Sequence, residues 1–186
     1  LYGLPESIGI SASYCTFLRN PCERIVSDFF WVNQHKPRHE VYDKFRVFID
    51  RAEHLEFYIH RISRAKEFEL TKPLQQHFSE LDANVEPNEE DRVAAYANLT
   101  SKFFFVGITE EYDQSIFLLA RDPGLNRILP WINTPLAANP LKPSFFSLPI
   151  DLRREIEKKT ERDVELYEKF RARHDAWFKN TNLRNT

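Results

Sequence analysis

Two short runs of apolar residues along the chain predict β-strands. The first run, YCTFL, extends from Tyr14 to Leu18, and the second, FFFVGI, extends from Phe103 to Ile108. Almost unbroken apolar runs of this length are typical of strands that are covered on both faces, as in a parallel sheet. The pattern therefore predicts two buried strands of one parallel sheet.

Each apolar run is followed directly by the start signals of a helix. After the first run and Arg19, we predict Asn20 as the N-cap and Pro21 as the first helical residue. After the second run, we predict Thr109 as the N-cap of another helix. Two strand-helix units favour an α/β fold. They also place Arg19 at the carboxyl end of a strand, the edge where open α/β sheets bind ligands.

The rest of the chain reads as helices and loops. The apolar positions between residues 36 and 102 follow a helical period. This pattern predicts a mostly helical insertion that flanks the ligand-binding cleft at the edge of the sheet. Six prolines between residues 122 and 149 exclude a long regular element there and predict an ordered loop. From Asp151 the period is helical again for about 27 residues, which predicts one long carboxy-terminal helix.

Composition narrows the class of protein. A chain of 186 residues with 42% hydrophobic and 29% charged residues suits one globular domain over residues 1–186. The net charge of -2 gives no overall field that would attract nucleic acid or an anionic membrane. Two cysteines cannot form a disulfide framework, and no apolar run reaches the roughly 18 residues of a membrane span. These features favour a soluble protein of a reducing compartment.

The richest candidate chemistry lies between Thr16 and Val32. Arg19 offers a cationic fork and Ser27 a hydroxyl two turns into the next helix, so both side chains suit one anionic group such as a phosphate. Arg24 shares a helix face with Ser27 and supplies either a second cation or an ion pair with a carboxylate elsewhere. The alternative without a ligand is that Arg19 and Arg24 form ordinary ion pairs and that Ser27 is exposed to solvent.

We expect no metal site from the histidine spacing. His35 and His39 are four residues apart, but Pro37 between them disfavours a regular helix. No cysteine or acid nearby completes a ligand set of the kind that zinc requires.

Three segments, in order along the chain, resemble a known enzyme family. Leu18–Ser27, LRNPCERIVS, resembles the LRxPxxRxxS segment of carbohydrate sulfotransferases of the heparan sulfate 2-O and 6-O type and their bacterial relatives. Phe105–Leu119, FVGITEEYDQSIFLL, is similar to the second marker of that family, a strand that ends in a GxTE turn and opens a helix. Ile156–Tyr167, IEKKTERDVELY, resembles its carboxy-terminal helix, which ends in D-x-x-L-Y.

The resemblance implies a P-loop-like α/β fold that uses 3'-phosphoadenosine 5'-phosphosulfate (PAPS) as cofactor. The sulfuryl group would pass to a hydroxyl of a carbohydrate acceptor. With this resemblance we expect a protein of the bacterial cytoplasm, or of the Golgi lumen if the source is eukaryotic. Arg19 and Ser27 match the family residues that hold the 3'-phosphate, and Arg24 matches the second arginine of the motif. The Gly-rich loop for the 5'-phosphosulfate and the usual catalytic base have no match in the chain, so we expect both upstream of Leu1.

Two other classes of function stay open. One is a small-molecule kinase of the P-loop fold, which requires a GxxxxGK[ST] segment upstream. The other is a sulfotransferase-like module that binds a ligand without catalysis.

Overall fold

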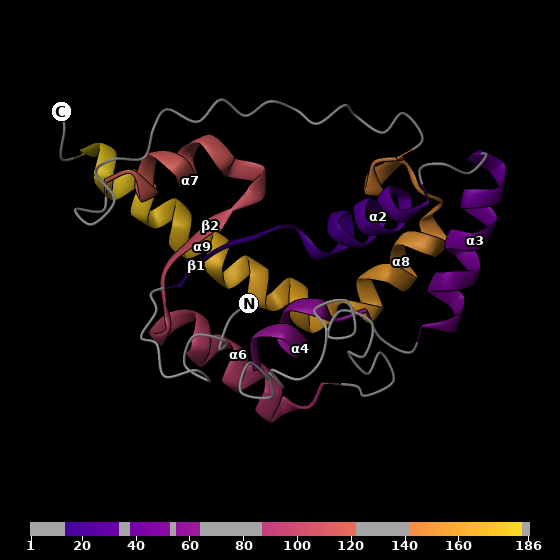
Figure 1. The fold of residues 1–186 in the computed structure, drawn as a ribbon, viewed down its shortest axis with the longest axis horizontal. Coiled ribbons are helices and arrows are strands. Elements are labelled where there is room, and N and C mark those ends of the chain that lie inside the picture. Colours follow the sequence, from indigo (N-terminus) through magenta and orange to yellow (C-terminus); the bar gives the residue numbers. More distant parts are fainter. Residues whose placement is uncertain (1–13, 34–37, 53–54, 64–86, 122–141, 184–186) are drawn as a thin grey trace, which may run out of the picture.

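A computed structural model describes residues 14–33, 38–52, 55–63, 87–121 and 142–183 (Figure 1). This part of the chain is mostly helical and contains one small sheet. In chain order its elements are β1 (Tyr14–Leu18), α2 (Pro21–Val32), α3 (Arg38–Arg51), α4 (Phe57–Ser63), α6 (Glu89–Ser101), β2 (Phe103–Ile108), the 3-10 turn η2 (Thr109–Glu111), α7 (Tyr112–Leu119), the 3-10 turn η4 (Phe145–Ser147), α8 (Ile150–Lys159) and α9 (Glu161–Leu183).

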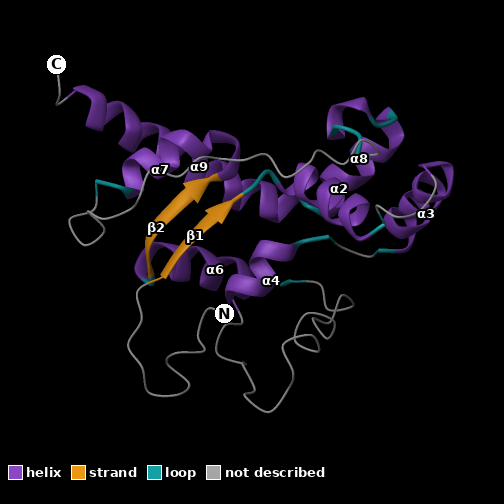
Figure 2. Cartoon of the chain, turned by 45° about the horizontal axis from the view of Figure 1, so that its top comes forward, coloured by secondary structure: helices purple, strands orange, loops and turns teal. Residues whose placement is uncertain are grey.

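Strands β1 and β2 lie side by side and run in the same direction (Figure 2). Leu18 at the end of β1 is opposite Ile108 at the end of β2. Both predicted strands and their parallel pairing are confirmed. The two strands are the whole sheet within the described residues. A wider, P-loop-like sheet remains a prediction.

Alternate residues of the strands pack into different hydrophobic clusters, as the period of a strand requires. Phe105 packs with Leu118 and Leu119 of α7. Leu18 and Ile108 pack instead with residues of α4, α6 and α9. Coverage is incomplete, because Cys15 is exposed and Phe104 is 43% exposed. The prediction that the strands are buried on both faces is therefore wrong at these two positions, which the described helices do not cover.

The segment 36–102 is helical wherever the structure describes it, as predicted. Residues 64–86 lie outside the described residues. Helix α4 contributes Ile59 and Ile62, and helix α6 contributes Leu99, to the cluster that contains the strand residues Leu18 and Ile108. The segment is thus part of the central core, because the strand-helix units bury their apolar side chains against it.

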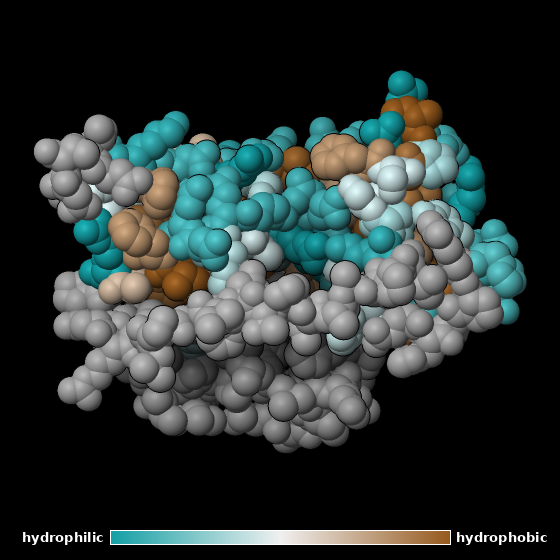
Figure 3. All heavy atoms as spheres, turned by 90° about the horizontal axis from the view of Figure 1, so that it is seen from above, coloured by the Kyte–Doolittle hydropathy of each residue, from teal (hydrophilic) through white to brown (hydrophobic). Residues whose placement is uncertain are grey.

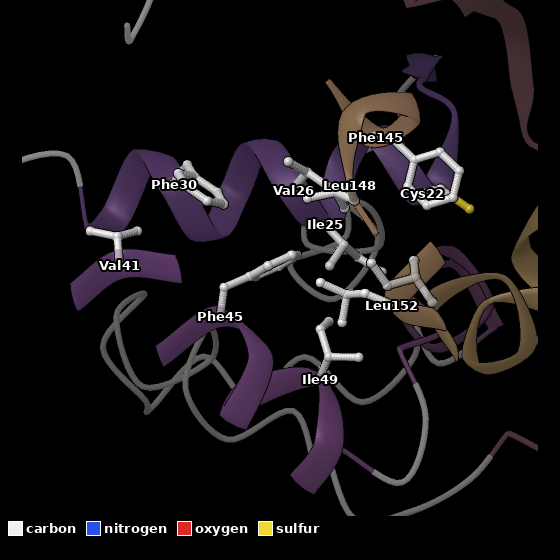
Figure 4. Close-up of a cluster of buried hydrophobic side chains, with 11 residues drawn as sticks. Cys22, Ile25, Val26, Phe30, Val41, Phe45, Ile49, Phe145, Leu148 and Leu152 are labelled. Carbon is white, nitrogen blue, oxygen red and sulfur yellow. The ribbon is translucent and has the colours of Figure 1, made fainter. Parts of the chain in front are cut away.

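A second cluster joins α2 to α3 and α8. Figure 4 shows side chains of α2 directed toward α3, with η4 and α8 closing the same cluster. Its fully buried members include three aromatic and aliphatic residues that carry much of the buried volume: Phe30, Phe45 and Ile49. Burying each such side chain is worth about 1.5 to 3 kcal/mol, so this cluster fixes α2 against α3 and α8.

The long helix predicted from Asp151 is broken at Thr160. Helix α8 ends at Lys159, and Thr160 has φ -119° and ψ 11°, outside the helical region. Its hydroxyl donates to the carbonyl of Ile156 at 2.8 Å and lies 3.5 Å from the thiol of Cys22. The prediction of a single helix is wrong, because the apolar period continues through the break. A long carboxy-terminal helix is nevertheless present, since α9 has 23 residues.

Exposed apolar side chains do not form one continuous face in the view of Figure 3, where hydrophilic residues separate hydrophobic groups. The large exposed ones include Trp31, Val32, Phe146 and Ile150. In the described residues, no helix is long and apolar enough to cross a membrane.

The ordered loop predicted between residues 122 and 149 is described only in part, because residues 122–141 lie outside the described residues.

We predict that Gly107→Ala lowers the free energy of unfolding by about 1 to 3 kcal/mol, the usual cost of overpacking. A β-carbon at Gly107 would lie 2.7 Å from two ring carbons of Phe17. That ring cannot move freely, because it packs against Phe105 and Tyr112 with ring centroids 5.8 and 5.4 Å apart. Urea unfolding measures the loss. In a Phe17→Leu background the additional loss should be smaller, and equal losses in both backgrounds would contradict this packing.

Candidate functional site

The turn that follows β1 is held by its backbone. The hydroxyl of Tyr58 accepts a hydrogen bond from the Arg19 N–H at 2.7 Å and donates to the Arg19 carbonyl at 3.0 Å. The next N–H, of Asn20, donates to Glu110 Oε1 at 2.8 Å. Two successive residues of the turn are thus fixed by groups from α4 and η2, and the side chain of Arg19 takes no part in this.

Glu110 links the turn to the carboxy-terminal helix. Its second oxygen, Oε2, accepts a hydrogen bond from the hydroxyl of Tyr167 at 2.9 Å. Burial, followed by the contact with Glu110, raises the pKa of Tyr167, so its hydroxyl stays a donor. One carboxylate therefore ties together the three segments that carry the family resemblance.

The start of the helix after β2 differs from the prediction. Thr109 does not cap a helix, because Thr109–Glu111 form η2 and α7 begins at Tyr112.

Asp163, four residues before Tyr167, holds the start of α4. Its carboxylate accepts backbone hydrogen bonds from Phe57 at 2.6 Å, Tyr58 at 2.7 Å and Ile59 at 2.9 Å. These are N–H groups of the first turn of α4, which have no partner within that helix. Asp163 is fully buried. Burial raises the pKa of Asp163 to about 6, against the lowering effect of the N–H donors.

The start of α2 is closed to ligands at its backbone. The side chain of Asn20 accepts hydrogen bonds from the N–H groups of Cys22 at 3.0 Å and Glu23 at 3.2 Å, which confirms the predicted N-cap. The N–H of Arg24 donates to the Asn20 carbonyl at 2.9 Å, and Pro21 has no N–H. An anion at this edge must therefore be bound by side chains.

Two cations at this edge have no acidic partner among the described residues. They are Arg19 and Lys142, and neither forms an ion pair or a side-chain hydrogen bond there. Burial, followed by the charge of Arg19, lowers the pKa of Lys142. The carboxylate of Glu23, which acts on Lys142 in the opposite sense, is occupied by hydrogen bonds from Ser144 and Phe145. The charges of Glu23 and Asp28 raise the pKa of Lys142, so the positive charge of the edge is partly compensated. Two cations without a direct acidic partner among the described residues nevertheless suit an anionic ligand.

The other two predicted site residues have different surroundings. Arg24 forms an ion pair with Asp28 at 2.8 Å, and its guanidinium carbon lies 3.9 Å from the ring centroid of Phe57. The sequence left two roles open for Arg24, a second cation for the anion or an ion pair with a carboxylate, and the structure shows the ion pair. Ser27 is partly buried on α2 and its hydroxyl makes no hydrogen bond within the described residues. That Arg19 and Ser27 hold one phosphate remains a prediction.

A second polar cluster is formed by residues of η2, α7 and α9. The hydroxyl of Ser115 is 2.9 Å from Nε2 of His174, and Nδ1 of the same ring is 3.2 Å from Glu111 Oε2. This is the order of nucleophile, base and acid in hydrolases. However, Ser115 is fully buried, and its hydroxyl also bonds the backbone N–H and carbonyl of Ile108. Ser115 therefore joins α7 to β2 and is not placed to attack a substrate.

No pattern of residues along the chain indicates a role for Lys142 or for the cluster around His174. Lys142 belongs to the proline-rich loop and approaches Arg19 only through the fold. His174 reads as one more position on the buried face of the last helix. Glu110 and Tyr167 lie inside the segments that resemble the sulfotransferases, so the motifs marked them without showing that they contact each other.

Comparison of the chain with protein-family models, with curated proteins and with solved structures finds no match. The functional reading therefore depends on the residues and contacts described above.

Asp163 predicts a specific pH dependence of stability. Because its folded pKa, about 6, is above its ordinary value of 3.8, the folded state binds more protons than the unfolded state between these pH values. Its contribution to the free energy of unfolding is therefore fully present below about pH 4 and is lost as the pH rises to about 6. The variant Asp163→Asn lacks this titration.

Urea unfolding at several pH values tests the prediction. The stability of the wild type relative to Asp163→Asn should fall as the pH rises from about 4 to about 7. The variant Asp113→Asn, which removes an exposed carboxyl from α7, controls for the loss of a charge. A difference between wild type and Asp163→Asn that rises with pH would show that the carboxylate form is favoured on folding.

Proposed function

We propose that the chain is the 3'-phosphate-binding part of a PAPS-dependent carbohydrate sulfotransferase. The observation that carries the proposal is the convergence of the three family-like segments on Glu110. Its carboxylate bonds Asn20 of the first segment and Tyr167 of the third, and it belongs to the second. This convergence supports a common role for the three segments, which is to present the side chain of Arg19 at the carboxyl edge of the sheet.

The charges at this edge support an anionic ligand such as the 3'-phosphate. Arg19 offers a planar fork that suits two phosphate oxygens, and Lys142 adds a point charge. Ser27 offers a hydroxyl donor from α2. Hydrogen bonds to a charged group are worth about 1.5 to 3 kcal/mol each, so two of them account for a large share of nucleotide affinity. In this proposal Arg24 acts indirectly, since it is engaged with Asp28 and Phe57.

Nucleotide preference separates this function from the alternatives. A kinase of related fold would bind nucleotides that lack a 3'-phosphate as tightly as those that have one. A binding module without catalysis would share the pocket and transfer no sulfate to a carbohydrate hydroxyl. Because Arg19, Ser27 and Lys142 are the described residues that this proposal assigns to the ligand, binding of the 3'-phosphate is the property that tests it.

We predict that Arg19→Ala weakens binding of 3'-phosphoadenosine 5'-phosphate about tenfold or more, because a charge-assisted contact is lost. Lys142→Ala should weaken it as well, by a smaller factor. Isothermal titration calorimetry measures both. The control is Arg154→Ala, which removes an exposed arginine from α8.

Two results would contradict the proposal. One is equal affinity of wild type and Arg19→Ala for 3'-phosphoadenosine 5'-phosphate. The other is equal affinity of the wild type for this nucleotide and for ADP, which lacks the 3'-phosphate and would favour the kinase alternative.

A further inference from the structure

The cluster at the junction of η2 and α9 contains a buried nitrogen that has no hydrogen-bond partner. His174 is 2% exposed, and its Nδ1 makes no hydrogen bond with any described residue. Glu111 Oε2, which is also buried and without a hydrogen bond, lies 3.2 Å from Nδ1 but is not aligned for one. Asp175 Oδ1 lies 3.8 Å from the same nitrogen. Two carboxylate oxygens thus surround one imidazole nitrogen.

The other side of the ring is fixed by Ser115. Its hydroxyl accepts from the N–H of Ile108 at 2.9 Å and donates to the carbonyl of Ile108 at 3.1 Å. When the hydroxyl keeps its hydrogen on that carbonyl, it accepts from Nε2 of His174, which assigns the imidazole hydrogen to Nε2. In that tautomer Nδ1 directs a lone pair toward two carboxylates, an arrangement that a bound cation stabilises.

We propose that Glu111, His174 and Asp175 bind a divalent transition-metal ion of the zinc type. The three ligand atoms lie within 4.8 Å of one another. A tetrahedral ion with bonds of about 2.0 to 2.1 Å holds its ligands about 3.3 Å apart. The 3.2 Å between Nδ1 and Glu111 Oε2 matches this separation, and the 3.8 Å between Nδ1 and Asp175 Oδ1 requires that the exposed side chain of Asp175 move toward the ion. One imidazole with two carboxylates suits zinc better than magnesium or calcium, which prefer oxygen ligands alone.

Two further features agree with a metal site. The contact between His174 and Ser115 is an outer-shell hydrogen bond of the kind that orients metal-bound histidines. The side chain of Asp175 is 41% exposed, so an ion can enter from solvent and water can occupy the remaining position. This site departs from the expectation of no metal, because that expectation considered only histidines that are close together in sequence.

One nearby charge opposes the ion. Nε of Arg171 donates to Glu111 Oε1 at 3.3 Å, and Arg171 also lies 3.9 Å from Glu168. It occupies the oxygen of Glu111 that faces away from His174, so Oε2 remains for the metal. Its positive charge lowers the affinity of the site for a cation. Removing that charge should therefore strengthen metal binding, which is an effect that a purely structural histidine network would not show.

Titration of the metal-free protein with Zn²⁺ tests the site. We expect saturable binding of one ion, weakened at least about tenfold by Asp175→Asn and by Glu111→Gln, and strengthened by Arg171→Gln. Glu161→Gln is the matched control, since it removes an exposed acid from the first turn of the same helix, far from the three ligands. Because the side chain of Asp175 is 41% exposed, neither Asp175→Asn nor this control removes a buried group.

A spectroscopic readout identifies the nitrogen. In long-range ¹H–¹⁵N spectra of the histidine rings, Zn²⁺ should shift the Nδ1 signal of His174 and leave Nε2 protonated. Absence of saturable binding would overturn the proposal. So would binding that is unchanged in Asp175→Asn and Glu111→Gln, because the ion would then be held elsewhere. The nucleotide measurements are independent of this result, since they depend on Arg19 and Lys142.

Discussion

The turn between β1 and α2 is fixed at its backbone, and this constraint determines what the site can do. Tyr58 bonds both backbone groups of Arg19, and Glu110 bonds the N–H of Asn20. The side chain of Asn20 is used within α2 as its N-cap. Because the polar groups of the turn are satisfied in this way, the guanidinium of Arg19 is left as the group available to a ligand.

The buried carboxylate of Asp163 supports this arrangement, because it binds the first turn of α4, which contains Tyr58. An ionised carboxylate buried without partners is strongly unfavourable, so Asp163 requires the three N–H donors of α4 that it accepts from. The charge of Arg24 also lowers the pKa of Asp163. Arg24 thus stabilises the residue that places Tyr58 against Arg19. In the proposed function Arg24 is therefore a positioning residue, which acts on Arg19 through Asp163 and Tyr58.

The sequence predicts local features well and contacts between distant segments poorly. The strands were predicted because their apolar runs are short and unbroken, and the start of α2 because Asn20 and Pro21 are strong local signals. The break at Thr160 was missed because the apolar period continues across it. Lys142 and His174 were missed because their roles arise only when distant segments meet.

The central claim is that Tyr58 positions Arg19 for an anionic ligand, and a double-mutant cycle tests it most directly. The affinity for 3'-phosphoadenosine 5'-phosphate is measured in wild type, Tyr58→Phe, Arg19→Ala and the double variant. Tyr58→Phe changes no charge and removes the hydroxyl that bonds Arg19. The account predicts a severalfold loss of affinity from Tyr58→Phe when Arg19 is present and no further loss once Arg19 is alanine. Equal losses in both backgrounds would show that the two residues act independently, and would contradict the account.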